Sequence, residues 1–249
     1  MRLRELTQQI KPSVCQIVAH TNRGAYRGSG FLVGDTMKIV TCHHVVSPPG
    51  TNVTKVEVLF GGRPYEVPVV AIRNIPSADL AVLDATGTNV PQLNGLTLGK
   101  FSDAEEGDDI LVVGFPLGEP IITIHKGIVS SKGRFRFEEP SVTVDCLKLD
   151  ASINVGNSGG PCWSLEEGKV VGIISARAPV SASLSYQIGE QIRQAKLALS
   201  QRPGRVEIMG VDPIELSINV ADVLYRAVEE TRQLGIGYAI SIEYVKGHL

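Results

Sequence analysis

The chain has 249 residues, a length that fits one large domain or two small ones. Its 24 Lys and Arg residues nearly balance 26 Asp and Glu residues, and the formal net charge of −2 favours neither nucleic acid nor anionic lipid as a partner. No apolar run approaches the roughly 20 residues of a membrane-spanning helix, and the N-terminal segment lacks the apolar core of a signal peptide. We therefore expect no nucleic-acid partner, no membrane contact and a cytoplasmic location.

The first predicted element is a short helix over residues 1–11. Leu3, Leu6 and Ile10 would share one face of it, and Pro12 disfavours helical backbone in the residue before it. After this helix, short runs rich in β-branched residues follow one another with Gly and Pro turns between them. This pattern is typical of an all-β sandwich or barrel.

Residues 89–107 interrupt the series of strands. They are poor in β-branched runs and contain Pro91, Gly95, Gly99 and Gly107. We interpret this stretch as a connector, and it divides the chain into residues 1–88, with the helix and a first β unit, and residues 108–249, with a second.

The sequence pattern changes again from residue 181. Apolar residues recur at helical spacing, and Asp212 followed by Pro213 is a typical helix start. Residues 181–235 are therefore predicted to form two amphipathic helices, inserted before a last strand over residues 236–244. Their apolar stripes need a surface, which could be the second β unit of the same chain or another copy of it in a homo-oligomer.

The four cysteines lie far apart in the sequence and form no Cys-x-x-Cys pair: Cys15, Cys42, Cys146 and Cys162. No histidine stands at the spacing of a zinc site, so we predict buried free thiols, no metal and no cofactor.

The segment Gly156–Pro161 carries the strongest chemical signal. Glycines on both sides of Ser158 permit a sharp turn that exposes a hydroxyl and lets backbone N–H groups converge, as an acyl-transfer nucleophile requires. The alternative is a plain surface turn, since Gly, Asn, Ser and Pro are all turn residues.

A serine nucleophile needs a base, normally a histidine oriented by a carboxylate. His43 and His44 stand at the end of a predicted strand, where neighbouring side chains point to opposite faces. Asp79 is followed by an apolar run, and burying it without a partner would be costly. On spacing alone, Asp79 could equally be a turn residue.

Together these segments resemble the chymotrypsin-like serine proteases, most closely their HtrA (Deg) branch. That branch carries the patterns TNxHVV, DLAV and DAxINxGNSGGP. The corresponding segments here are residues 41–46 (TCHHVV), residues 79–82 (DLAV) and residues 150–161 (DASINVGNSGGP). The alignment selects His44 over His43, and residues 28–31 (GSGF) and 235–240 (GIGYAI) also resemble family segments.

The resemblance implies two six-stranded antiparallel β-barrels with a catalytic triad of His44, Asp79 and Ser158 between them. It also implies an oxyanion hole in the loop of Gly156, Asn157 and Ser158, with the backbone N–H groups of Gly156 and Ser158 as donors. Chymotrypsin-type zymogens carry Asp where Asn157 stands, so activation by propeptide cleavage is not expected. The family often appends a PDZ domain, for which this chain is too short.

The resemblance places the substrate-binding residues at Ser152, Asn154, Ser175, Ala176 and Arg177. Ser152 aligns with the floor of the primary specificity pocket and is uncharged, which favours small or medium apolar side chains before the scissile bond. Arg177 aligns with the pocket wall, where it either narrows the pocket or points into solvent.

The predicted function is therefore a serine endopeptidase that acts on proteins or peptides. The alternative is a catalytically silent protease-like module that binds peptides or acts as a scaffold. The sequence argues against an α/β-hydrolase, because that fold needs the acid and the histidine after the serine, and His248 near the end is the only histidine after Ser158. That fold also needs alternating strands and helices, a pattern that is absent before residue 181.

Overall fold

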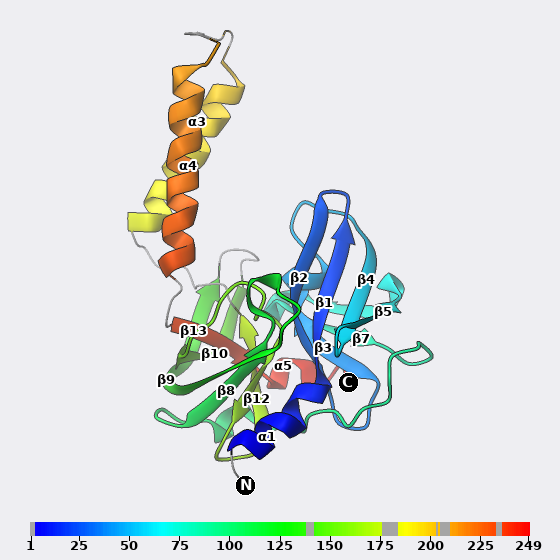
Figure 1. The fold of residues 1–249 in the computed structure, drawn as a ribbon. Helices are drawn as coiled ribbons and strands as arrows, with labels where there is room; N and C mark the ends of the chain where they lie inside the picture. Colours follow the sequence, from blue (N-terminus) through cyan, green and yellow to red (C-terminus); the bar gives the residue numbers. More distant parts are fainter. Residues whose placement is uncertain (1–2, 138–141, 176–183, 203, 205–209, 233–235) are drawn as a thin grey trace. The chain divides into compact units, whose positions relative to one another are not determined.

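The computed structural model describes residues 3–137, 142–175, 184–202, 204, 210–232 and 236–249 (Figure 1). The chain forms two compact units. The larger contains both β units and comprises residues 1–179 and 235–249, and the smaller is the helical pair within residues 180–234.

The N-terminal part of the larger unit is a helix followed by one antiparallel sheet. Helix α1 (Leu3–Ile10) buries Leu6 and Ile10, as its apolar face predicts. Seven strands pair in the order β5-β4-β1-β2-β3-β7-β6. Their bounds are β1 Val14–Thr21, β2 Gly24–Leu32, β3 Lys38–Cys42, β4 Val53–Phe60, β5 Arg63–Val67, β6 Ile72–Ile75 and β7 Leu80–Asp84, with the short helix α2 (His43–Val46) between β3 and β4.

This first sheet is open, whereas the resemblance predicted a closed six-stranded barrel. Closure would need β5 to pair with β6, and Pro68 directly follows β5 with no N–H to donate. A 3₁₀ turn over Val69–Ala71 then separates the two strands. The first β unit is therefore a half-barrel with β5 and β6 at its edges.

The second β unit is a closed six-stranded barrel, as predicted. Its strand order is β10-β13-β12-β11-β8-β9. The bounds are β8 Asp109–Gly114, β9 Thr123–Phe137, β10 Val142–Asp150, β11 Pro161–Ser164, β12 Lys169–Ser175 and β13 Ile236–Ser241, and α5 (Glu243–Lys246) follows. Strand β13 lies between β10 and β12, so the helical insertion separates two strands that are neighbours in the barrel.

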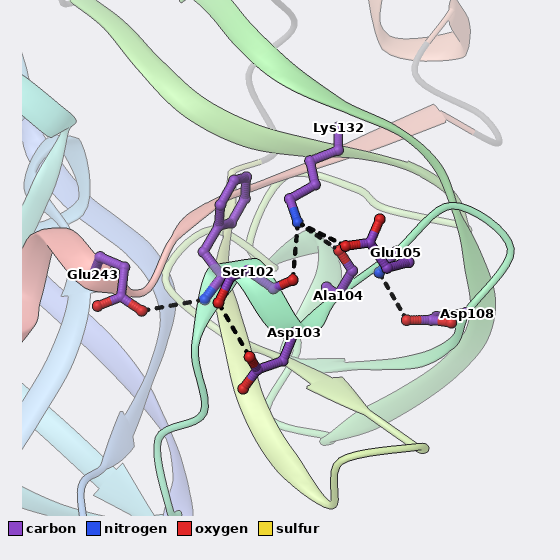
Figure 2. Close-up of polar contacts among 8 residues, drawn as sticks. Ser102, Asp103, Ala104, Glu105, Asp108, Lys132 and Glu243 are labelled. Carbon is purple, nitrogen blue, oxygen red and sulfur yellow. Dashed lines mark hydrogen bonds and ion pairs between the residues drawn. The ribbon is translucent and has the colours of Figure 1, made fainter.

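The middle of the connector contacts both β units. Single bridges join Leu96 to Val33, which directly follows β2, and Leu98 to Val170 of β12. Near its end, the Lys132 ammonium donates to the carbonyl oxygens of Ser102 (3.1 Å) and Ala104 (2.8 Å), as Figure 2 shows. These contacts hold the connector against the second barrel.

The smaller unit consists of α3 (Leu184–Ser200) and α4 (Pro213–Arg232), in agreement with the helical periodicity. Asp212 caps α4, since its Oδ1 accepts from the N–H groups of Ile214 (2.9 Å) and Glu215 (3.3 Å). An ion pair of 2.6 Å between Lys196 and Asp222 joins the two helices.

Candidate active site

His44 and Asp79 form a two-point contact between α2 and the start of β7. Asp79 Oδ1 accepts from the backbone N–H of His44 (3.0 Å), and Asp79 Oδ2 lies 2.7 Å from His44 Nδ1. An ionised carboxylate only accepts, so the imidazole proton is on Nδ1 and Nε2 is the basic nitrogen. Asp79 is 3 % exposed, so these donors take the place of water around its carboxyl oxygens.

His43, the neighbouring histidine, faces a different environment. Its Nδ1 lies 2.9 Å from Oδ1 of Asn74, at an exposed position on β6. Its backbone N–H donates to the Asp79 carbonyl (2.9 Å), which helps to fix the position of Asp79. Only His44 therefore presents its ring to the buried carboxylate.

The loop that carries Ser158 packs directly against the chain before His43. Gly159 has a φ of +89°, and a Cβ there would collide with the carbonyl oxygen of Ser29 and the hydroxyl of Thr41. A Cβ on Gly28 would lie 2.6 Å from the Val45 side chain and 3.1 Å from the Ser158 carbonyl oxygen. These two glycines allow the Ser158 loop to approach α2, and Ser158 itself is 4 % exposed.

Strand β12 links the same two segments. The Ile174 carbonyl accepts from the backbone N–H of Gly159 (2.8 Å) and from Sγ of Cys42 (3.3 Å). The Ser158 loop and the end of β3 are thereby held by one carbonyl acceptor of the second barrel.

Within the described residues, Cys42, His44 and Asp79 are a group whose ligand atoms could hold a metal ion, because these atoms lie within 4.8 Å of one another. His44 and Asp79 already use their atoms in a hydrogen bond, at a separation shorter than two ligands of one zinc ion would have. We therefore interpret the group as a hydrogen bond between His44 and Asp79 with the Cys42 thiol nearby. All four cysteines are buried free thiols, as predicted, and burial raises the pKa of the Cys162 thiol to about 12.

The backbone of the predicted oxyanion loop is held by several hydrogen bonds. The Val155 carbonyl accepts from Leu117 N–H (2.6 Å). Because C=O and N–H point in opposite directions across a trans peptide, the Gly156 N–H points away from Leu117. Gly156 has a φ of +99°, which favours glycine at this position.

Asn157 was included in the predicted oxyanion loop, with no donor role for its own N–H. Its N–H donates to the Asn154 carbonyl (3.0 Å) and is therefore engaged within the turn. Its side chain is fully buried, and neither Oδ1 nor Nδ2 has a hydrogen-bond partner among the described residues. Asn157 is thus packed into the interior of the loop, with its N–H bonded within the turn.

The predicted substrate-binding residues are described only in part. Ser152 is exposed between the buried Ala151 and Ile153, and Asn154 is half-buried. Ser175 is buried at the end of β12, where it pairs with Tyr238 of β13. Ala176 and Arg177 lie outside the described residues.

Two residues of this region had no predicted role. Ser29 is visible in the sequence as the centre of a Gly-Ser-Gly triplet, but its hydrogen bonds run to residues more than 80 positions away. Leu117 adopts a φ of +58°, which is uncommon for leucine and which no local sequence signal indicated.

Comparison with known proteins places these features in a family. Residues 28–173, more than half of the chain, match the family model described as "Trypsin-like peptidase domain". A "Probable periplasmic serine endoprotease DegP-like" of Chlamydia muridarum is 36 % identical over 155 residues, which cover 62 % of this chain and 29 % of that protein. Human "Serine protease HTRA4" is 31 % identical over 236 residues, covering 88 % of this chain and 47 % of the relative. The chain thus spans less than half the length of these relatives.

Solved structures show the same fold. The active form of the Rv3671c protease from M. tuberculosis aligns with a TM-score of 0.62 at 20 % identity, over 97 % of this chain and 81 % of the other. An HtrA-type protease, AlgW, determined with a tripeptide, aligns with a TM-score of 0.61 at 22 % identity, over 98 % of this chain and 60 % of the other.

The comparisons also contradict the predicted location and confirm the predicted family resemblance. The expected cytoplasmic location is wrong, because several relatives are named as periplasmic endoproteases. Among the described residues, no helix combines the length and apolarity needed to cross a membrane. The predicted resemblance to HtrA proteases is confirmed, and the chain belongs to the trypsin-like peptidase family.

Proposed function

We propose that this chain is a serine endopeptidase in which Ser158 is the nucleophile, His44 the general base and Asp79 the residue that orients His44. The observation that carries the proposal is the two-point contact between the Asp79 carboxylate and His44. It selects the tautomer that a base needs, and the Ser158 loop packs against the same short helix.

The reaction would begin when Ser158 Oγ attacks the carbonyl carbon of the scissile peptide bond. His44 Nε2 takes the hydroxyl proton, and the imidazolium that forms is stabilised by Asp79. His44 then protonates the leaving amine, which gives an acyl-enzyme on Ser158. Water, deprotonated by His44, releases the acid and restores Ser158.

The developing oxyanion would be stabilised by the backbone N–H groups of Gly156 and Ser158. The bond from Leu117 to the Val155 carbonyl turns the Gly156 N–H away from the 115–118 turn, an orientation that suits this role. One such donor typically lowers the barrier by about 3–4 kcal/mol.

Proteins or peptides are the proposed substrates, with small or medium apolar residues before the scissile bond, because Ser152 is uncharged. Ser152, Asn154, Ser175, Ala176 and Arg177 are the proposed substrate contacts. Relatives named as periplasmic favour a periplasmic or extracellular site of action.

Cleavage of a peptide library by the wild type and by Ser158→Ala tests the proposal. We expect the wild type to cleave after small or medium apolar residues and the variant, folded by its thermal unfolding, to cleave nothing. Equal cleavage by both proteins would contradict the role of Ser158. Peptide binding without cleavage by the wild type would favour the alternative, a catalytically silent peptide-binding or scaffold module.

A further inference from the structure

Ser29 of β2 lies at the contact between the first sheet and the Ser158 loop. Although it belongs to the first β unit, it is 0 % exposed and its backbone N–H donates to the Ser158 carbonyl (2.8 Å). Its hydroxyl donates to the Gly156 carbonyl (2.7 Å) and accepts from Phe115 N–H (2.9 Å). One side chain therefore ties together three segments that are distant in the sequence.

The two carbonyl groups that Ser29 binds lie on either side of Asn157. The Gly156 carbonyl belongs to the peptide that precedes Asn157, and the Ser158 carbonyl belongs to the peptide that follows Ser158. Fixing both limits the rotation of the peptide between them, which carries the Ser158 N–H. The Asn157 carbonyl of that same peptide accepts from Gly160 N–H (3.0 Å), and Ser29 adds a hydrogen bond on each side of it. Ser29 thus helps to fix the peptide of one proposed oxyanion donor and anchors the residue that carries the other.

Other hydrogen bonds hold the rest of the loop, among them those from Asn157 N–H to the Asn154 carbonyl and from Gly160 N–H to the Asn157 carbonyl (both 3.0 Å), whereas the Gly156 carbonyl accepts from the Ser29 hydroxyl. Gly156 can rotate more freely than any other residue type, and the neighbouring Asn157 carboxamide makes no hydrogen bond among the described residues. Without the Ser29 hydroxyl, the Gly156 carbonyl would lose the donor that it has in this buried site. A buried carbonyl without a donor favours rotation of its peptide toward another partner.

The surroundings of Ser29 fit a hydroxyl of this size. A Cβ on Gly114 would lie 2.7 Å from Ser29 Oγ and 2.8 Å from Asn157 Oδ1, so glycine at position 114 leaves room for both polar groups. A Cβ on Gly30 would lie 2.7 Å from the Ile17 side chain. The Ser29 hydroxyl is accordingly held in a narrow space between the two β units.

We propose that Ser29 is a positioning residue that holds the oxyanion loop in its catalytic arrangement. The inference rests on the proposed function. It goes beyond that function because it states which residue fixes the oxyanion loop. That residue belongs to the first sheet and does not contact the reacting atoms.

The test compares Ser29→Ala with Ser13→Ala in the full chain. Ser13 is a matched control, because it is 1 % exposed and its hydroxyl also donates to a backbone carbonyl, that of Asn94 (2.6 Å), outside the loop. Ser13→Ala loses one hydrogen bond to a backbone carbonyl, and Ser29→Ala loses the corresponding bond to the Gly156 carbonyl together with the bond from Phe115 N–H. We expect only Ser29→Ala to lower kcat, on the order of 10²-fold, with KM little changed, because an oxyanion donor acts in the transition state.

A peptide aldehyde supplies a second readout, since its adduct with Ser158 places an oxyanion in the hole. Ser29→Ala should weaken aldehyde inhibition much more than inhibition by a product peptide, whereas Ser13→Ala should change neither. If Ser29→Ala does not fold, Ser29→Cys replaces it, because a thiol keeps a polar atom at this position, although a larger one, and is a weaker donor than a hydroxyl. An intermediate kcat would then support the proposal.

Wild-type kcat and aldehyde affinity in either Ser29 variant would overturn the inference and leave the proposed function intact. A folded wild type that neither cleaves peptides nor binds the aldehyde would overturn the proposed function itself. The two failures are therefore distinguishable.

Discussion

At the scale of single residues, the buried charge of Asp79 is the feature that needs an explanation. A buried carboxylate is costly unless donors surround it, and Asp79 receives one from the His44 backbone and one from the His44 ring. Its φ of +53° lies in the left-handed region, which is uncommon for residues other than glycine. Such strain is typical of functional positions, and here it places the carboxylate on His44.

Replacing Asp79 by Asn should therefore reduce catalysis far more than stability. The Asn side chain would present an N–H₂ group to His44 Nδ1 and favour the imidazole tautomer that cannot act as a base. We expect kcat to fall on the order of 10³–10⁴-fold. Steady-state kinetics on the folded variant measures the effect.

Asp84→Asn is the control for this variant, because Asp84 is also a paired carboxylate on β7 but lies at the other end of the strand. It should keep the wild-type kcat. A kcat for Asp79→Asn within a few-fold of the Asp84→Asn value would contradict the assigned role of Asp79.

At the scale of elements, most strands could be predicted from the sequence, but whether the first sheet closes into a barrel could not. β-Branched runs indicated a series of short strands, although not β11 (Pro161–Ser164) or the full length of β9 (Thr123–Phe137), and helical periodicity indicated the insertion. Whether β5 meets β6 depends instead on Pro68 and on pairing between strands that are not neighbours along the chain. Tertiary pairing of this kind leaves no local sequence signal.

The pairing of β3 and β7 makes a prediction about acid stability. Lys38 and Asp84 face each other across these strands, and the hydrogen bond from Lys38 is the main reason that the pKa of Asp84 falls from its ordinary value of 3.8 to about 2. Between these two values the unfolded chain binds the proton and the folded chain does not. The stabilisation is thus present above about pH 4 and is lost as the pH falls toward 2.

Urea unfolding of the wild type and Asp84→Asn as a function of pH measures this contribution. The wild type should be the more stable protein above pH 4, and the difference should shrink as the pH approaches 2. The effect is small because both side chains are partly exposed to solvent. A difference that stays constant over this range would contradict the assignment.

The residues of the candidate site likewise fall into those that the sequence could locate and those that only the folded structure reveals. His44, Asp79 and Ser158 lie in contiguous motifs, so each could be located from the sequence. Ser29 and Leu117 could not be assigned roles, because their contacts join segments that only the folded chain brings together. The engaged N–H of Asn157 likewise depends on the turn geometry and not on residue type.

At the scale of the whole molecule, the site belongs to neither β unit alone. The first sheet supplies His44, Asp79 and Ser29, and the second barrel supplies the Ser158 loop and the Ile174 carbonyl that binds it. The expected cytoplasmic location rested on the absence of an apolar signal-peptide core, and it was wrong because relatives are named as periplasmic endoproteases. Self-association through residues 181–235 stays a prediction, which gel filtration of a chain lacking 181–234 would test.

The most direct test of the account is covalent labelling with a fluorophosphonate, followed by identification of the modified residue by mass spectrometry. The account predicts one adduct, on Ser158, that is absent in Ser158→Ala and forms much more slowly in His44→Ala. His43→Ala should label at the wild-type rate, because His43 faces Asn74 and not Asp79. A folded wild type without an adduct on Ser158, or equal labelling of the two histidine variants, would contradict it.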